Sequence, residues 1–414
     1  MDYTLSTFYK AQDKLKAVIN KTNFELLDNF GERNECTIFA KREDLQVVRS
    51  YKIRGAFNMI ASLSDEERKK GVICASAGNH AQGVAFACKK LDISSQIYMP
   101  VTTPKQKVNQ VKRYGNNNIK IILTGDTFDQ SYSEAEKHSI ESGITMIPPF
   151  DDPRVIHGQG TVALEIIEQL EKPLDFLIIP IGGGGLAAGV ASVFKQLSPS
   201  TLLIGVEPLG APAMKTSIEA GKVIELDQID PFTDGAAVKM VGIITFPICK
   251  KLLDQVVLVP EGLIAQTMLK LYNENAIVAE PAGALALAGT ELLSNEVKGK
   301  RVGVIISGGN NDIIRFPEIK ERALLYQQLK HYFIVQFPQR PGALKQFVAE
   351  VLGPTDDIVH FEYSKKTSRE NGPALVGIEL KFPEDFEPLI NRMKELGFFN
   401  KYVNDQIELM QFLV

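Results

Sequence analysis

Residues Asp175–Gly189 read DFLIIPIGGGGLAAG, an apolar run followed by four consecutive glycines. The run Phe176–Ile181 is typical of a strand buried on both faces, and a helix-like segment begins at Leu186. Because Gly182–Gly185 lack Cβ atoms, their N–H groups can turn toward one point, beside the positive end of the following helix. The loop therefore predicts a phosphate site, with a tight turn that holds no ligand as the alternative. Its spacing differs from the Gly-x-Gly-x-x-Gly and Gly-x-x-x-x-Gly-Lys-Ser/Thr patterns, which argues against dinucleotides and nucleoside triphosphates.

The composition predicts an ordinary soluble protein of two or three domains. The chain has 414 residues, of which 44% are hydrophobic and 23% charged, and a net charge of −4, which argues against binding to nucleic acid or to an anionic membrane. Its four cysteines, Cys36, Cys74, Cys88 and Cys249, show no metal-ligand spacing and predict reduced thiols. The N-terminus has no apolar signal segment, and no run of about 18 apolar residues occurs. We therefore expect a cytoplasmic protein.

Short apolar runs alternate with amphipathic segments along the first three quarters of the chain. Such alternation predicts right-handed βαβ units and a parallel sheet. The expected strands are 36–41, 72–75, 96–99, 119–123, 145–147, 176–181, 202–207, 256–259 and 301–306. The expected helices are 6–20, one ending at 63, 81–90, 104–114, 127–142, 157–170, 186–197, 262–276 and 282–293.

Polar or glycine-rich loops follow two further strands. Ser76-Ala77-Gly78-Asn79-His80 comes after the strand 72–75, and Ser307-Gly308-Gly309-Asn310-Asn311 comes after the strand 301–306. The first loop precedes a helix, so its N–H groups suit a carboxylate or phosphate oxygen. Lys52 stands near a helix start among apolar neighbours, in a position where a lysine is ordinarily a solvated surface charge.

The last part of the chain has a different pattern. A charged helical segment, 316–328, is followed by a strand at 332–337, a helix at 341–352, strands at 358–365 and 374–382, a helix at 383–396 and a strand at 399–403. This β-α-β-β-α-β order is that of a ferredoxin-like fold. His360 lies in one of these strands and is better explained by packing than by catalysis. We interpret this part as a binding module attached to an α/β enzyme.

Four motifs together resemble the threonine dehydratase family. They are Ser50-Tyr51-Lys52-Ile53-Arg54-Gly55-Ala56, Ser76-Ala77-Gly78-Asn79-His80-Ala81-Gln82-Gly83, the four glycines, and Ser307-Gly308-Gly309-Asn310. The resemblance covers roughly residues 4–320 and implies the pyridoxal-phosphate fold of the tryptophan synthase β chain, an α/β fold with two open twisted subdomains. It also implies a catalytic domain at 1–318 with a smaller subdomain at about 56–150, a connector at 319–328 and an ACT-like regulatory domain at 329–414.

The resemblance assigns a role to each motif. Lys52 would bond covalently to pyridoxal 5'-phosphate and act as the base at Cα, and Asn79 would bind the cofactor's ring hydroxyl. Ser307 would face the pyridine nitrogen, where a hydroxyl leaves the ring a weaker electron sink than a carboxylate would. The cofactor phosphate would be held by Gly182, Gly183, Gly184, Gly185 and Leu186. The substrate carboxylate would be held by Ser76, Ala77, Gly78, Asn79 and His80.

The implied reaction is elimination of water from L-threonine, with deamination to 2-oxobutanoate and ammonia and L-serine as a weaker substrate. The implied regulation is inhibition by isoleucine, opposed by valine, in a homotetramer or dimer of dimers. A catabolic threonine/serine dehydratase is the alternative enzyme, and an amino-acid sensor on an inactive enzyme fold is the alternative outside catalysis. The sensor would lack one of Lys52, Asn79 and Ser307, and all three are present.

Three positions depart from related patterns. Serine racemases of similar sequence carry a second serine where this chain has Ala77, which argues against racemisation. Those relatives bind a divalent cation through a glutamate, a backbone carbonyl and an aspartate, at positions that match Glu207, Ala211 and Ala213 here. Because Ala213 stands in the place of the aspartate, no divalent metal is expected. The Thr-Pro-Leu that is usual early in the family appears here as Thr22-Asn23-Phe24, which leaves the contacts of the N-terminal segment open.

Overall fold

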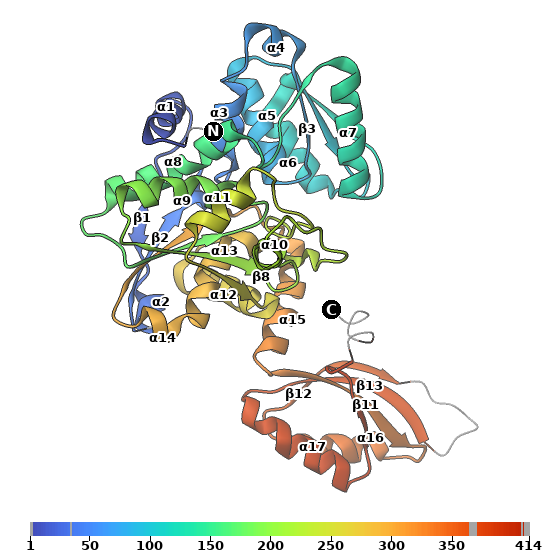
Figure 1. Ribbon diagram of the computed structural model, residues 1–414. Helices are drawn as coiled ribbons and strands as arrows, with labels where there is room; N and C mark the ends of the chain where they lie inside the picture. The colour runs from blue at the N-terminus through green and yellow to red at the C-terminus, as the bar shows by residue number, and fades with distance from the viewer. Residues whose placement is uncertain (1–2, 34, 364–370, 407–408, 410–414) are drawn as a thin grey trace. The chain divides into compact units, whose positions relative to one another are not determined.

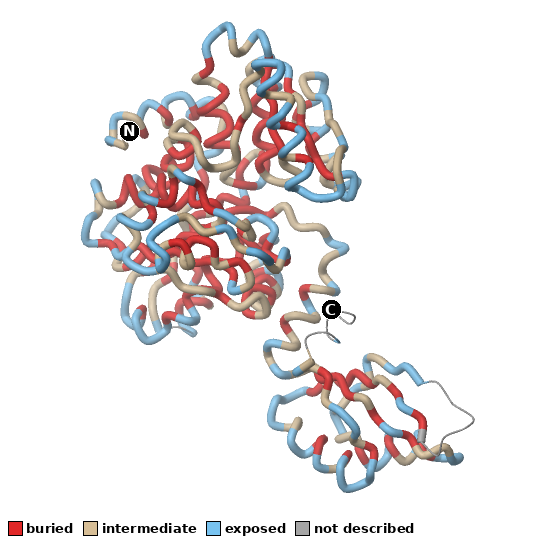
Figure 2. Tube along the Cα trace, turned by 45° about the vertical axis from the view of Figure 1, so that its right-hand side comes forward, coloured by how far each residue is buried: buried red, intermediate tan, exposed pale blue. Residues whose placement is uncertain are grey.

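The computed structural model describes the chain except for residues 1–2, 34, 364–370, 407–408 and 410–414 (Figure 1). Its contacts divide it into two units, Met1–Asp312 and Ile313–Val414. In both units the buried residues follow the strands and the helix faces that cover them (Figure 2). The end of the strand predicted at 358–365 lies outside the described residues.

The larger sheet of the first unit has six strands in the order β1-β2-β10-β7-β8-β9. All neighbours pair in parallel except β1, which is antiparallel to β2. The predicted parallel sheet is therefore confirmed, and the short edge strand β1 was not predicted. The strands are β1 (Phe24–Leu26), β2 (Thr37–Arg42), β7 (Phe176–Pro180), β8 (Leu202–Pro208), β9 (Gln255–Val259) and β10 (Arg301–Ile306).

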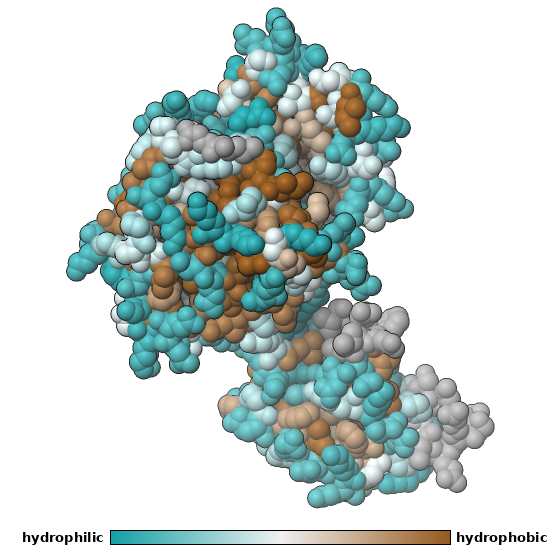
Figure 3. Space-filling model, viewed as in Figure 1, coloured by the Kyte–Doolittle hydropathy of each residue, from teal (hydrophilic) through white to brown (hydrophobic). Residues whose placement is uncertain are grey.

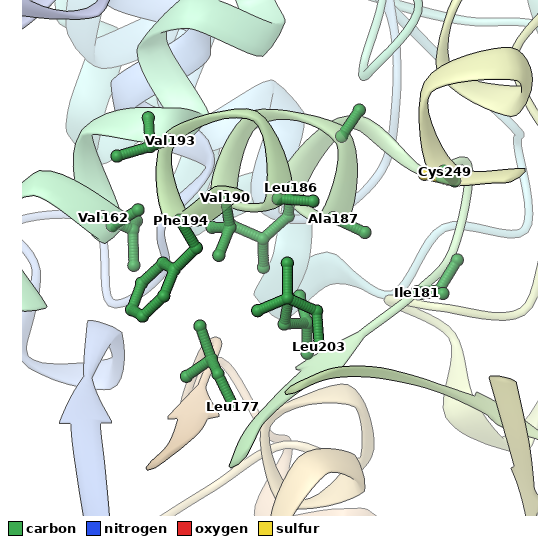
Figure 4. Packing of buried hydrophobic residues seen from close by; sticks show 14 of the residues in the cluster. Val162, Leu177, Ile181, Leu186, Ala187, Val190, Val193, Phe194, Leu203 and Cys249 are labelled. Atoms are coloured by element: carbon green, nitrogen blue, oxygen red, sulfur yellow. The ribbon is translucent and has the colours of Figure 1, made fainter. Parts of the chain in front are cut away.

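Helices cover both faces of this sheet (Figure 1). On one face, Leu186, Val190 and Phe194 of α9 point toward Leu177 and Leu203 of the sheet (Figure 4). All five residues of β7 are buried, as an apolar run between two helix layers requires. The helices of the first face are α8 (Pro153–Gln169), α9 (Gly185–Leu197) and α11 (Thr245–Leu252), and those of the second are α12 (Glu261–Asn275) and α13 (Pro281–Leu292).

The smaller sheet of the first unit is parallel throughout, in the order β5-β4-β3-β6. Its strands are β3 (Val72–Ala75), β4 (Ser95–Met99), β5 (Ile119–Leu123) and β6 (Thr145–Met146). Its helices are α3 (Lys52–Ile60), α4 (Asp65–Lys70), α5 (Asn79–Leu91), α6 (Lys105–Gly115) and α7 (Phe128–Ser142). The remaining helices of the unit are α1 (Leu5–Leu15), α2 (Asp28–Arg33), α10 (Ala213–Ala220) and α14 (Ser294–Val297).

A buried cluster of four charges ties α3 to the larger sheet. Arg54 of α3 donates to both oxygens of Glu43 at 2.7 and 2.8 Å and to both oxygens of Glu165 at 2.7 and 2.9 Å. Lys41 of β2 donates to Glu165 at 2.6 Å and to the Thr22 carbonyl at 2.7 Å. The two positive and two negative charges balance, so each buried carboxylate has a cation as partner. Thr22, the first residue of the segment Thr22-Asn23-Phe24, thus contributes its carbonyl to this cluster.

The second unit has an antiparallel sheet in the order β12-β13-β11-β14, as the ferredoxin-like prediction requires. Helix α15 belongs to this unit, where the Tyr332 hydroxyl donates to Glu321 at 2.7 Å. The predicted boundary at 318 falls inside α15. The strands are β11 (Lys330–Pro338), β12 (Asp357–Tyr363), β13 (Asn371–Glu379) and β14 (Phe399–Tyr402), and the helices are α15 (Phe316–Tyr326), α16 (Ala343–Gln346) with a π-helical turn (Phe347–Val351), and α17 (Phe386–Glu395).

Candidate active site

The glycine loop connects β7 to α9 and is closely packed on one side. Gly184 has a φ of +93°, which favours glycine. A Cβ on Gly183 would overlap the ring of Phe150, and one on Gly185 would lie 2.9 Å from the Phe150 Cβ. Residues with a side chain would therefore displace either the loop or Phe150.

The amide groups of this loop have no acceptor in the part of the chain that the structure describes. The backbone N–H groups of residues 182–187 donate to none of its carbonyls or side chains, and the first bond of the helix is from the Ala188 N–H to the Gly184 carbonyl at 2.8 Å. Unpaired N–H groups at a helix N-terminus attract an anion. The loop thus fits the phosphate that its sequence predicts.

Lys52 is the first residue of α3, and its amine points to the segment beside the glycine loop. The Lys52 Nζ donates to the Pro149 carbonyl at 3.0 Å. Pro149 precedes Phe150, so the lysine amine and the glycine loop flank the same two residues. Burial lowers the pKa of the Lys52 amine to about 8, and the negative charge of Glu280 opposes this shift. A lysine with this pKa is more often a free amine at neutral pH than a surface lysine is.

Ser307 follows β10 and lies against the segment that carries Lys52. The Tyr51 N–H donates to the Ser307 carbonyl at 3.1 Å, and the Gly309 N–H donates to the Arg49 carbonyl at 2.9 Å. The Ser307 hydroxyl is buried and donates to the Ala282 carbonyl at 3.0 Å. Its oxygen keeps lone pairs for a further partner.

Asn79 is the first residue of α5, and its carboxamide is held from two sides. Its Nδ2 donates to Glu280 Oε1 at 2.5 Å, and its Oδ1 accepts from Asn310 Nδ2 at 2.7 Å. The Asn310 Nδ2 also donates to the Val48 carbonyl at 2.8 Å. Because a backbone carbonyl can only accept, Asn310 must present its NH2 group there, and Asn79 must then turn its own NH2 group toward Glu280.

The predicted carboxylate loop presents three of its five N–H groups without a described acceptor. The Ser76 N–H donates to the Tyr98 carbonyl at 3.1 Å and the Gly78 N–H to Ser76 Oγ at 3.2 Å. The N–H groups of residues 77, 79 and 80 have no such bond among the described residues. A Cβ on Gly78 would meet no atom within 4 Å, so the loop faces open space there.

The side chain of His80 is directed away from this loop. Its Nε2 lies 2.9 Å from the Ile147 carbonyl, and burial together with the Lys52 charge lowers the pKa of His80 to about 3. The ring is therefore neutral at physiological pH, and only the backbone of His80 is placed to bind a substrate.

Four residues at this site were missing from the sequence-based assignment of roles: Pro149, Phe150, Glu280 and Asn310. Pro149 and Phe150 follow β6, and polar or packed residues after a parallel strand are a signal that could have found them. Asn310 belongs to the motif Ser307-Gly308-Gly309-Asn310, in which only Ser307 was assigned a role. Burial, aided by Asp234, raises the pKa of Glu280 to about 7, although bonds from Asn79 and Asn310 oppose the shift.

Glu207, which matches a cation ligand of the related serine racemases, has a structural role in this protein. Glu207 accepts from the Met214 and Lys215 N–H groups at 2.7 and 2.8 Å and so caps α10. Within the residues that the structure describes, no three His, Cys, Asp or Glu side chains gather as metal ligands. Helices long and apolar enough to cross a membrane are also absent from this part of the chain.

Comparison with known proteins identifies the family of the chain. Residues 15–308 match the family of pyridoxal-phosphate dependent enzymes, and residues 321–413 match the C-terminal regulatory domain of threonine dehydratase. The chain is similar to L-threonine dehydratase biosynthetic IlvA of Halalkalibacterium halodurans, with 53% identity over 98% of this chain and 97% of that protein. The same enzyme of Bacillus subtilis is 52% identical over 98% of this chain and 96% of that protein.

A solved structure shares the fold of the larger part. The processed form of threonine deaminase isoform 2 from Solanum lycopersicum is 41% identical, with a TM-score of 0.74 over 77% of this chain and 88% of that chain. The match to the regulatory domain supports the biosynthetic reading over the catabolic one. From the two family matches and the near-complete coverage of its relatives, the chain belongs to the biosynthetic threonine dehydratase family of pyridoxal-phosphate enzymes.

Proposed function

We propose that this chain converts L-threonine to 2-oxobutanoate and ammonia with pyridoxal 5'-phosphate as cofactor, and acts more weakly on L-serine. The observation that carries the proposal is the position of Lys52. Its amine, with a pKa lowered to about 8, lies at the Pro149–Phe150 segment that also packs on the glycine loop. A nucleophilic amine beside an anion site is what the cofactor's aldehyde and phosphate require.

The residues of the site fit this cofactor. Lys52 would bond to it, the unpaired N–H groups of Gly182–Leu186 would hold its phosphate, and the second hydrogen of the Asn79 NH2 group would bind its ring hydroxyl. Ser307 would contact the pyridine nitrogen by its hydroxyl. The chemistry that pyridoxal phosphate supplies when bound is an electron sink for the pair left at Cα after deprotonation.

The chain's own groups then position the substrate and move its protons. The N–H groups of Ala77, Asn79 and His80 would bind the threonine carboxylate, which directs the Cα–H bond toward Lys52. Lys52 Nζ takes the Cα proton, and the β-hydroxyl leaves with a proton as water. A water molecule is added back when the amino group is released, so threonine gives 2-oxobutanoate and ammonia in balance.

Ser307 would steer the outcome at Cα. A serine hydroxyl is too weak an acid to protonate the pyridine nitrogen, so charge at Cα is stabilised less than it would be by a carboxylate partner. Early loss of the β-hydroxyl is then favoured over slower reactions of the deprotonated substrate. Ala77 supplies no hydroxyl for a second base, which supports elimination over racemisation.

We further propose that the second unit binds isoleucine as inhibitor and valine as its antagonist, and that the enzyme makes the first committed step toward isoleucine. The match to a regulatory domain supports this proposal. The ligand would have to bind two states of the enzyme with different affinity, and a coupling of about 1–3 kcal/mol would change threonine affinity by roughly 5–150-fold. Threonine saturation curves of the whole chain with and without isoleucine test it, and an unresponsive enzyme would favour the catabolic reading.

We also propose a homotetramer or dimer of dimers. Apolar residues gather over the middle of the first unit on the face shown in Figure 3. Large apolar side chains of this unit are exposed, such as Leu209 at 50% and Ile243 at 72%. Extended apolar surface is typical of protein interfaces. Light scattering of the purified protein measures the assembly directly.

A cytoplasmic location is proposed from the thiols. Cys36, Cys74, Cys88 and Cys249 are all free, and three of them are buried. Unpaired cysteines at these separate places suit a reducing compartment. Their titration with a thiol reagent under denaturing conditions should count four reactive groups.

The assignment of Lys52 is tested by Lys52→Ala. The variant loses both the covalent attachment and the base at Cα, so 2-oxobutanoate formation should cease while the phosphate loop still binds the cofactor non-covalently. Turnover well above a trace would show that another residue does the chemistry.

A further inference from the structure

The carbonyl groups of the glycine loop are held by helix α11, which has no role in the proposed chemistry. The Thr245 hydroxyl donates to the Gly183 carbonyl at 2.6 Å, and the Gly242 N–H donates to the same oxygen at 3.1 Å. The Cys249 thiol lies 3.7 Å from the Gly184 carbonyl as a weak donor (Figure 4 shows Cys249 beside the start of α9). All three donors approach the loop from α11 or the turn before it.

The start of α11 is itself fixed by a residue next to Phe150. Asp151 accepts from the N–H groups of Ile243 and Ile244 at 2.9 Å and of Thr245 at 3.2 Å. A carboxylate at a helix N-terminus stabilises that end of the helix. Phe150 packs on the glycine loop from one side. Asp151, the next residue, positions Thr245, whose hydroxyl donates to the Gly183 carbonyl of the loop.

Carbonyl and N–H groups of one peptide unit point in opposite directions. A bond that fixes the carbonyl of Gly183 therefore also fixes the next N–H, that of Gly184, and the same holds for Gly184 and Gly185. These are N–H groups that lack an acceptor among the described residues. Glycine backbone is freely rotating unless it is held, so without such bonds the loop would lose entropy when it orders around an anion.

We propose that Thr245 is a positioning residue that sets the affinity of the glycine loop for the cofactor's phosphate group. It would act through the loop, by fixing the carbonyl of Gly183, and not by contact with the cofactor. The inference rests on the proposed function of the loop as the phosphate site. It predicts an effect that depends on the phosphate ester and not on the pyridine ring or the aldehyde.

The test compares pyridoxal phosphate with pyridoxal, which lacks the phosphate, by absorbance titration of the cofactor-free whole chain. Three variants are measured beside the native protein: Thr245→Val removes the hydroxyl at nearly constant shape, Thr245→Ser keeps it, and Thr267→Val is the matched control. The buried Thr267 hydroxyl donates to the Leu263 carbonyl at 2.9 Å within α12, away from the loop. Thermal melting of each cofactor-free variant reports folding.

Loss of one neutral hydrogen bond predicts that Thr245→Val weakens pyridoxal phosphate binding by about 3- to 10-fold. Pyridoxal binding should not change, Thr245→Ser should restore the native ratio of the two affinities, and Thr267→Val should keep it. Equal weakening of both ligands, or an unchanged ratio, would overturn the proposal. If the native protein itself did not prefer pyridoxal phosphate, the phosphate role of the loop would fail first and the inference with it. Should Thr245→Val not fold, Thr245→Ala gives the same comparison.

Discussion

Replacing Glu280 by glutamine should disable the site by changing which groups can accept hydrogen bonds. Glu280 receives one bond from Asn79 Nδ2 at 2.5 Å and one from the Asn310 N–H at 3.2 Å. A glutamine of the same shape has one acceptor oxygen, so its NH2 group must face one of these two donors. Whichever donor it faces loses its acceptor, and where that donor is Asn79 Nδ2 the carboxamide keeps only the bond that its Oδ1 accepts from Asn310 Nδ2.

The magnitude follows from the kind of bond that is lost. A hydrogen bond to a charged acceptor contributes about 1.5–3 kcal/mol, which corresponds to roughly 10- to 100-fold in rate. We therefore expect Glu280→Gln to lower kcat/KM for threonine by about that factor at pH 8, where the carboxylate is ionised. Formation of 2-oxobutanoate is the assay, and the spectrum of the bound cofactor reports its ring environment.

A double-mutant cycle separates a positioning role from a general loss of structure. If Glu280 acts through Asn79, Glu280→Gln should cost little more once Asn79→Ala is present. Full additivity of the two losses would refute this reasoning.

Glu280 should also make the stability of the native protein depend on pH. Burial raises its pKa to about 7 in the folded protein, whereas the carboxyl of the unfolded chain loses its proton near pH 4.5. The native protein should therefore lose stability as the pH rises from about 4.5 to 7. The glutamine variant should lack this slope in thermal melting.

Three further outcomes are expected. Arg54→Met should lower the free energy of unfolding by about 3–5 kcal/mol in denaturant titration, because two buried carboxylates keep only Lys41 as a cation, and a loss under about 1 kcal/mol would contradict this. The rate at which the cofactor-free protein bonds pyridoxal phosphate should rise about tenfold between pH 7 and pH 9, since the pKa of Lys52 is lowered to about 8; a midpoint near 10 would show an ordinary lysine. A chain that ends at Asp312 should retain threonine elimination but ignore isoleucine, and continued inhibition would place the effector site in the first unit.

The strands β3, β5 and β10 begin and end at the predicted residues. β3 and β10 are mostly apolar runs whose residues are buried except for Arg301, as the pattern predicts, whereas β5 is an edge strand that is interrupted by Lys120 and has no fully buried residue. Strand β1 has three residues with Glu25 in the middle, too short for a pattern. Helix α11 was missed because its eight residues contain Pro247 and two lysines, although it carries Thr245.

The site was predictable where one loop carries the chemistry and unpredictable where distant segments meet. The glycine loop and Lys52 stand out through residue type and neighbours. Glu280 contacts Asn79 across 201 positions, and no local pattern encodes that pairing. The sequence also does not show in which direction a side chain points. His80 belongs to the predicted loop, but its ring is directed away from the loop, toward the Ile147 carbonyl.

The order of strands in the larger sheet has a consequence for how the protein is made. Strand β10 lies between β2 and β7 and pairs with both, although it is the last strand of the first unit to be synthesised. On the ribosome, β2 and β7 must therefore wait with one edge each unpaired until residue 306 has emerged. Ser307 and Asn310 follow that strand directly, so the nascent chain closes its sheet and completes its cofactor site in the same step.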